Sequence, residues 1–149
     1  MEKFGKSQSV KRVEDVRFLT GDGRYVEDIA PKNALNAFFF RSPVAHATIT
    51  ELDVTDAREA EGVQAVLTCA DLEAAGMNTE MFAALVANRD GTKGAATSRN
   101  VLAKDRLRFV GEPIVAVIAE TMDQARDAAE LIVLDYDELP TKMDLRAGG

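Results

Sequence analysis

The sequence predicts an α+β fold with a mixed sheet built from two units, each in the order strand, strand, helix, strand. The second unit, residues 106–140, carries the clearest signals, because short apolar runs, turn residues and a capped helix follow one another there without a break. The first unit, residues 34–68, repeats this order with a shorter helix. A chain of 149 residues that is 46% hydrophobic and 29% charged is an ordinary globular chain, and we expect one domain.

The first unit opens with an aromatic strand over 34–41. Three phenylalanines, Phe38 to Phe40, follow one another in it. Successive large apolar residues are typical of a strand that is covered on both faces, and Pro43 then interrupts the ladder. A second strand is predicted over 48–54 from its imperfect alternation of apolar and polar residues.

A short helix over 57–60 follows these two strands. Thr55 or Asp56 is suited to cap its start, because both side chains accept hydrogen bonds from free backbone N–H groups. Gly62 is suited to end it in a left-handed conformation. The apolar run over 63–68 then predicts the last strand of this unit.

The second unit contains five predicted elements. They are a strand over 106–110, a turn over 111–113, a strand over 114–120, a helix from 122 to about 132 and a strand over 133–137. Thr121 and Gln124 have the spacing of a capping box at the start of the helix. In each unit a strand, a crossover helix and a strand imply parallel neighbours with a right-handed crossing, while the leading hairpin makes the sheet mixed.

One stripe of this helix is apolar and mostly small: Met122, Ala125, Ala129 and Ile132. Four charged residues point elsewhere: Asp123, Arg126, Asp127 and Glu130. We therefore expect the small-residue face to lie close against a sheet.

The remaining segments predict a domain over 11–140, preceded by a flexible N-terminus over 1–10 and followed by a C-terminal tail over 141–149. The apolar pattern within 11–20 predicts one or two helical turns that stop at Gly21. The Gly-Asp-Gly sequence at 21–23 predicts a tight turn, because no buried strand precedes it and no helix with a third Gly or a Lys follows.

Residues 71–100 predict a helical and loop insertion. We expect a short capped helix near 71–75, a helix over 79–87 and an exposed, mobile loop over 88–100. An apolar stripe in this region consists of Met77, Met81, Phe82 and Leu85. Such a stripe is more often core than a cofactor site, although methionine-rich faces also bind partners.

Charge excludes several classes of partner. The chain has 18 Lys and Arg against 25 Asp and Glu, a net charge of −7, which repels nucleic-acid phosphates and anionic membrane surfaces. The longest apolar run, Ile114 to Ala119, is far shorter than the ~20 residues of a membrane helix, and the first residues lack a signal-peptide core. We therefore expect no nucleic-acid partner, no membrane association and a cytoplasmic location.

The residue types that bind metals are scarce. Cys69 is the only cysteine, so the chain can form no internal disulfide and cannot supply the roughly four thiolates of a typical iron–sulfur cluster. We interpret Cys69 as a buried, inert thiol rather than a nucleophile. His46 is the only histidine, and we interpret it as a structural hydrogen-bonding residue rather than a metal ligand.

Three further places have alternative readings. Glu112 lies in a turn where an enzyme could expose a carboxylate, but turns favour polar residues and no second carboxylate is fixed beside it, so a turn role is favoured. Residues 41–43 (Arg-Ser-Pro) with His46 could contact a neighbouring domain or an anion. We favour the simpler interpretation, a strand end whose arginine is solvated. The acidic segment 135–138 is favoured as a solvated edge strand over a cation site, because alternate strand residues face opposite sides.

Three segments carry a resemblance to a known family. They are GDGRYVEDI at 21–29, FRSPVAHATITELDVTDAREAEGVQAVLTCADL at 40–72 and RFVGEPIVAVIAETMDQARDAAELIVLDYDELP at 108–140. Together they resemble the amino-terminal region of molybdenum hydroxylase large subunits, the family of xanthine dehydrogenase, aldehyde oxidase and aerobic carbon monoxide dehydrogenase. The resemblance covers most of the chain except residues 1–9 and 77–98, and it implies an α/β hammerhead domain.

The resemblance implies a larger enzyme that oxidises or hydroxylates its substrate at a molybdopterin-type molybdenum cofactor. In that enzyme, oxygen comes from water and electrons leave through iron–sulfur clusters and FAD. No position of this chain matches the family's cofactor or catalytic motifs, so we expect no catalytic, cofactor-binding or metal-binding residue here. The implied partners are the molybdopterin-binding domains of the same large subunit and the iron–sulfur and flavin subunits.

Two functional hypotheses follow from these observations. In the first, the chain is a non-catalytic structural domain of a molybdenum-dependent oxidoreductase, separately made or truncated from the large subunit, and inactive by itself. In the second, it is a stand-alone binding or adaptor module with a hammerhead fold and no enzymatic role. The sequence does not reveal the substrate.

Overall fold

The computed structural model describes residues 12–81, 86–94, 99–144 and 146. The predicted flexible N-terminus at 1–10 and the last residues of the predicted tail lie outside the described residues. The chain divides into two compact units, residues 1–34 and 35–149. Across the described ranges, no helix has both the length and the apolar character needed to cross a membrane.

The first unit contains the short helix α1 (Asp15–Leu19) and the 3₁₀ turn η1 (Glu27–Ile29). Helix α1 confirms the helical turns predicted within 11–20. Gly21 has a φ of +79° and its N–H donates to the carbonyl of Phe18 at 3.3 Å, which ends the helix as predicted.

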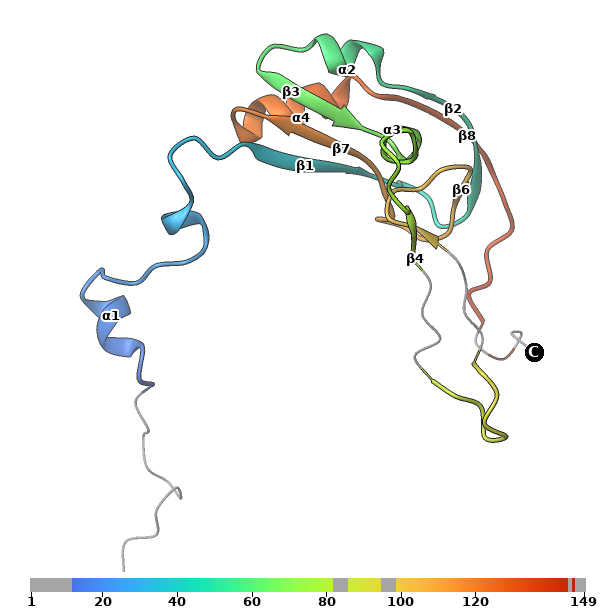
Figure 1. Cartoon of the computed structure of the whole chain (residues 1–149), viewed down its shortest axis with the longest axis horizontal. Helices are drawn as coiled ribbons and strands as arrows, with labels where there is room; N and C mark the ends of the chain where they lie inside the picture. The colour runs from blue at the N-terminus through green and yellow to red at the C-terminus, as the bar shows by residue number, and fades with distance from the viewer. Residues whose placement is uncertain (1–11, 82–85, 95–98, 145, 147–149) are drawn as a thin grey trace, which may run out of the picture. The chain divides into compact units, whose positions relative to one another are not determined.

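The second unit contains eight strands and three helices among its described residues (Figure 1). The strands are β1 (Asn36–Arg41), β2 (Ala47–Asp53), β3 (Val63–Leu67), β4 (Glu80–Met81), β5 (Arg99–Asn100), β6 (Arg106–Leu107), β7 (Pro113–Ala119) and β8 (Val133–Glu138). The helices are α2 (Thr55–Glu59), α3 (Cys69–Ala74) and α4 (Met122–Glu130). The α+β class is confirmed.

The strands form two three-stranded sheets and one two-stranded ribbon. One sheet has the order β1-β7-β3 and is called here the β7 sheet, and the other has the order β6-β2-β8 and is called the β2 sheet. Strands β4 and β5 form the ribbon. Figure 1 shows β1, β7 and β3 side by side with α4 next to them, and β2 running along β8.

The prediction of parallel neighbours in one mixed sheet is wrong. All strand pairs of the described residues are antiparallel, and the two strands that flank α4, β7 and β8, belong to different sheets. The predicted leading hairpins are wrong for the same reason, since β1 and β2 also lie in different sheets. Strand β7 already has β1 and β3 on its two edges, so β8 completes the β2 sheet instead.

Helix α4 closes the core from one side. Its buried residues are Ala125, Ala128 and Ala129, and the helix packs against β1 and β7, which confirms the predicted small-residue face. Only Met122 of the predicted stripe departs from the pattern, because it is exposed at the helix start. The fully buried side chains of Leu107, Ile114 and Val117 belong to the same core cluster.

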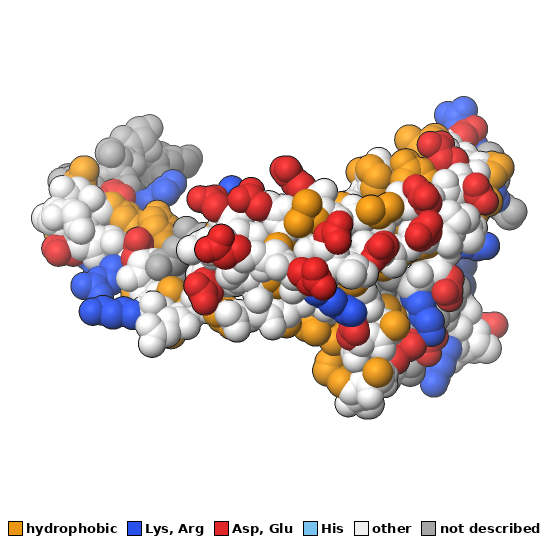
Figure 2. Space-filling view, turned by 90° about the horizontal axis from the view of Figure 1, so that it is seen from above, with side chains coloured by type: hydrophobic (Ala, Val, Ile, Leu, Met, Phe, Trp, Pro, Cys, Tyr) orange, Lys and Arg blue, Asp and Glu red, His pale blue; other side chains and the backbone are white. Residues whose placement is uncertain are grey.

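The outward side of the same helix is acidic. Asp123, Asp127 and Glu130 are all exposed, as predicted. Figure 2, which views the molecule from above Figure 1, shows many acidic side chains on the face that is seen. Water therefore solvates this part of the surface.

The helix starts confirm one predicted cap and correct another. The capping box of α4 is present: the hydroxyl of Thr121 accepts from the N–H of Gln124 at 3.2 Å, and the Gln124 side chain accepts from the N–H of Thr121 at 3.0 Å. The predicted cap of α2 by Thr55 or Asp56 is wrong. Its N-cap residue is Val54, and Asp53 accepts from the N–H of Thr55 at 2.9 Å. An acidic side chain just before the helix satisfies the N–H instead.

The predicted helix over 79–87 is wrong where the structure describes it. Residues 80–81 form β4, which pairs with β5. The Asn78 side chain accepts from the N–H of Glu80 at 3.1 Å, and this local bond competes with helix formation. Phe82 and Leu85 lie outside the described residues. The short helix predicted near 71–75 is confirmed with an earlier start, as α3.

Helix α2 ends at Glu59 with Ala60 as its extended C-cap, so Gly62 does not end it as predicted. Gly62 has a φ of +78°, and a Cβ placed on it would overlap the side-chain amide of Gln124. We therefore expect Gly62→Ala to lower the free energy of unfolding by two separate effects. The left-handed backbone strain costs about 1–2 kcal/mol, and damage to the α4 capping box costs about 1 kcal/mol. Gly76→Ala is the matched control, because its φ is +77° and a Cβ there meets nothing within 4 Å. Urea unfolding of both variants checks the difference, and equal losses would refute the role of Gln124.

Candidate functional site

The turn between β6 and β7 contains a buried charged side chain, Glu112, the only one among the described residues. Only 2% of Glu112 is exposed. Its Oε2 accepts from the backbone N–H of Arg108 at 2.6 Å, and its Oε1 lies 3.9 Å from the Arg108 guanidinium. Oε1 has no hydrogen-bond partner among the described residues. Glu112 thus closes the turn onto its own chain.

Backbone bonds anchor this turn to the end of β1. The N–H of Gly111 donates to the carbonyl of Ser42 at 2.9 Å, and the N–H of Ser42 donates to the carbonyl of Glu112 at 2.9 Å. The turn predicted at 111–113 is present but lies slightly earlier, because Pro113 already begins β7. The idea that it exposes a carboxylate is wrong, because the turn folds Glu112 inward onto the Arg108 N–H.

Arg41 adds a side-chain link to the same turn. Its guanidinium donates to the carbonyl of Gly111 at 2.9 Å and lies 5.6 Å from the ring centroid of Phe39. Arg41 is exposed at the end of β1. Its bond to Gly111 shows that it also fixes the β6–β7 turn.

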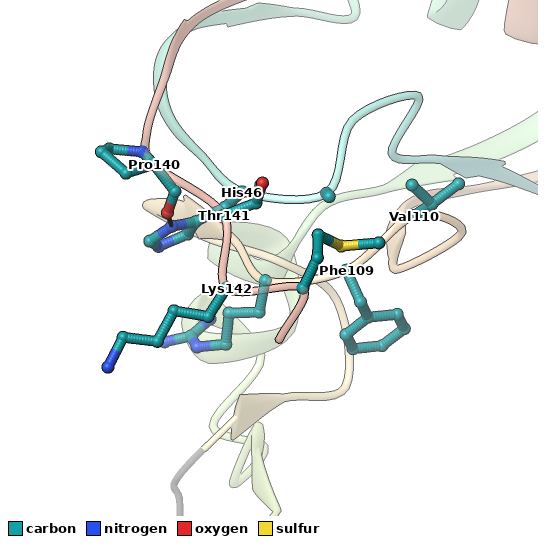
Figure 3. Close-up of a pocket in the computed structure, with 9 residues that line it drawn as sticks. His46, Phe109, Val110, Pro140, Thr141 and Lys142 are labelled. Carbon is teal, nitrogen blue, oxygen red and sulfur yellow. Dashed lines mark hydrogen bonds between the residues drawn. The ribbon is translucent and has the colours of Figure 1, made fainter. Parts of the chain in front are cut away.

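His46 joins the ends of two strands of the β2 sheet (Figure 3). Its Nδ1 lies 2.9 Å from the carbonyl oxygen of Pro140, and because a carbonyl only accepts, Nδ1 carries the proton. The N–H of Leu139 also donates to the carbonyl of His46 at 2.9 Å. The prediction of a structural hydrogen-bonding histidine is confirmed.

A hollow of about 500 Å³ lies beside His46. Figure 3 shows His46, Pro140 and Lys142 on one side of it and Phe109 and Val110 on the other. Arg108 also lines it, but no carboxylate or thiol does. His46, Thr141 and Lys142 are the lining side chains of types that acid–base or nucleophilic chemistry uses, and Nδ1 of His46 is already bonded to the carbonyl of Pro140.

Cys69 is 2% exposed and begins α3, which confirms the buried thiol. The strand β8 is an edge of the β2 sheet, and Asp135 and Asp137 on it are exposed, which confirms the solvated acidic edge. Within the described ranges, no group of three or more His, Cys, Asp or Glu side chains could hold a metal ion.

Two ion pairs hold α3 in place. The Arg58 guanidinium lies 2.8 Å from Asp71. Partial burial raises the pKa of Asp71, but bonds from the Thr68 hydroxyl and N–H and the charge of Arg58 outweigh it, so the pKa lies below its usual value. Lys104 lies 2.8 Å from Glu73, and its hydrogen bond holds the pKa of Glu73 below the usual value. Both pairs favour the charged forms and fix the helix.

A second hollow, of about 400 Å³, lies on the face of the β7 sheet that α4 does not cover. We call it the outer-face groove. Its lining residues are Phe39, Arg41, Leu67, Leu72, Val101, Leu102, Pro113 and Ala116. Sequence reasoning missed this groove, since we predicted β1 to be covered on both faces. That prediction is wrong for the described residues: Phe38 and Phe40 pack on the core, while Phe39 is 41% exposed.

The predicted methionine stripe is not core where the structure describes it. Met77 and Met81 are both exposed. The loop predicted over 88–100 is exposed over 88–93, as expected.

Two antiparallel sheets packed with short helices form a small α+β domain with a hydrophobic core. Comparison with known proteins identifies its family. Residues 20–140 match the family described as aldehyde oxidase and xanthine dehydrogenase, a/b hammerhead domain. The chain belongs to this family, which confirms the resemblance inferred from the sequence.

Known relatives are much longer than this chain. It is 42% identical over 137 residues to the nicotine 6-hydroxylase large subunit of Paenarthrobacter nicotinovorans. The match covers 92% of this chain and 16% of that protein. It is 37% identical over 134 residues to the carbon monoxide dehydrogenase large chain of Afipia carboxidovorans, covering 90% of this chain and 15% of that protein. The chain therefore spans about one-sixth of the length of these relatives.

A solved structure agrees with this assignment. Quinoline 2-oxidoreductase from Pseudomonas putida 86 is similar with a TM-score of 0.75 and 40% identity, over 89% of this chain and 16% of that one. The fold of this domain is therefore that of a hammerhead domain within a larger oxidoreductase chain.

Proposed function

We propose that this chain is a non-catalytic structural domain of a molybdenum-cofactor-dependent oxidoreductase, which packs against the molybdopterin-binding domains of the large subunit. The observation that carries the proposal is the match of residues 20–140 to a hammerhead-domain family. In the two relatives described above, the matched region makes up only about one-sixth of the large subunit. A domain of that size leaves most of the polypeptide to hold the cofactor and the substrate.

The described residues do not fit a molybdenum cofactor or an iron–sulfur cluster. No metal-ligating group of three side chains is present among them, and Cys69 is buried. Glu112 and His46 both make structural bonds. In the proposal, the molybdenum cofactor, the iron–sulfur clusters and FAD are therefore held by the rest of the complex, and this chain contributes no reacting group.

The relatives' names support further partners. They include a "large subunit", a "large chain" and a "complex subunit gamma", so these homologues are parts of multi-subunit enzymes. We extend this to the present chain, with iron–sulfur and flavin subunits as partners of the assembled complex. The location that goes with this proposal is the cytoplasm.

Isolation of the native complex tests the proposal. An antibody raised against this chain should recover a molybdopterin-binding polypeptide, and metal analysis should find molybdenum in proportion to it. A serum without the antibody is the control. Recovery of this chain with neither molybdenum nor a larger polypeptide would refute the proposal and favour the stand-alone binding module.

A further inference from the structure

We propose that the outer face of the β7 sheet is the surface that packs against the molybdopterin-binding part of the large subunit. This inference rests on the proposed function and names the surface involved. Six side chains make up the face: Ala37, Phe39, Ala65, Leu67, Ala116 and Ile118.

The strand register places these residues together. Phe39 of β1 and Leu67 of β3 both lie opposite Ala116 of β7, and residues opposite each other in a ladder share a face. Ala37 and Ala65 lie opposite Ile118 in the next row of the same face. The face is therefore two continuous rows across all three strands.

The intervening row points the other way. Phe38 of β1 and Val66 of β3 lie opposite Val117, and these three residues belong to the core together with the alanines of α4. Helix α4 thus covers only the inner face. Helix α3 borders the outer face, since its Leu72 lines the outer-face groove together with Leu67 and Ala116.

The outer face has the composition of a buried surface. All six of its residues are apolar, and a sheet with one solvated face alternates polar residues on that side. The β2 sheet of this same chain does so, with exposed Thr50, Glu51 and Asp135. The contrast between the two sheets indicates that water covers one and protein covers the other.

The outer-face groove shows what kind of surface fits. A neighbouring hollow of about 220 Å³ shares Arg41, Val101 and Pro113 with the groove, so the two form one depression. Its floor is apolar, and Arg41 and Arg99 stand along it. An apolar surface with carboxylates at its edge complements this arrangement.

The length of the relatives selects the occupant. About five-sixths of each matched large subunit lies outside the hammerhead region. Where a hammerhead belongs to the same polypeptide, the remaining domains are present at a high effective concentration, in the mM range for short linkers. A second copy of the hammerhead has no such advantage, so we assign the face to the molybdopterin-binding part.

Cysteine labelling in the native complex tests the assignment. Ala37→Cys places a thiol on the outer face, and Thr50→Cys places one on the exposed side of the β2 sheet as the matched control. The natural Cys69 is buried, so its background is low. We expect maleimide to label position 37 about tenfold more slowly than position 50 in the native complex, and equally fast after unfolding in urea, as read by peptide mass spectrometry.

The outcomes separate the two proposals. Equal labelling of both positions in a complex that contains the molybdenum polypeptide would overturn the docking face and leave the proposed function intact. Protection of position 37 in assemblies of this chain alone would assign the face to a second copy and also overturn the inference. A complex without molybdenum would defeat the proposed function itself. If Ala37→Cys does not fold, Ala65→Cys serves for the same measurement, because Ala65 lies in the same row of the outer face.

Discussion

Replacing Glu112 by alanine is expected to lower the free energy of unfolding by about 3 kcal/mol. The change leaves the partly buried N–H of Arg108 without its acceptor at 2.6 Å and removes the partner of the Arg108 guanidinium. It also opens a cavity beside the β6–β7 turn, which the N–H of Gly111 ties to β1. Urea unfolding followed by circular dichroism measures the loss.

Two variants sharpen this experiment. Glu112→Gln keeps a carbonyl oxygen for the Arg108 N–H and loses only the charge, so we expect a smaller loss, of about 1 kcal/mol. Glu130→Ala, on the exposed side of α4, should change stability by about 0.5 kcal/mol or less. A Glu112→Ala loss no larger than that of Glu130→Ala would show that the buried carboxylate does not hold the turn.

Substituting leucine for Ala128 is expected to lower the free energy of unfolding by about 2–3 kcal/mol. Ala128 is fully buried where α4 packs on β1 and β7, and its methyl group sets how closely the helix approaches the sheet. A leucine there must push the helix outward or adopt a strained rotamer. The midpoint of urea unfolding reports the change.

The neighbouring residue supplies the control for that substitution. Asp127 is exposed on the same helix, so Asp127→Leu adds a comparable side chain without entering the core. We expect it to stay within about 0.5 kcal/mol of the natural chain. If both leucine variants were equally stable, the small-residue face would not determine the packing of α4.

Features set by nearby residues were predictable from the sequence. Helix α4, its capping box and its buried alanines were predicted, because the 3.6-residue period and the cap spacing are local properties. The left-handed Gly62 was predicted for the same reason. Where two local signals competed, as when Asn78 bonded to the N–H of Glu80 instead of joining a helix, the prediction was wrong.

Sheet assignment was not predictable by the same reasoning. Which strands pair depends on the free edges left by residues far apart in the chain, and β7 uses both of its edges for β1 and β3. The burial of Glu112 was missed because it depends on the path of the turn back to Arg108. The outer-face groove was missed because a run of apolar residues alone does not say which face this chain covers.

The central claim is that this chain supports a molybdenum enzyme without taking part in the reaction, and turnover of the assembled complex tests it most directly. Complexes carrying Glu112→Gln or His46→Gln should show an unchanged kcat per molybdenum and an unchanged pH profile. A general acid or base contributes about 10²–10⁴-fold to the rate. A fall of that size in a complex that still holds its molybdenum would contradict the claim, and a rate within about twofold of the natural complex is the result we predict.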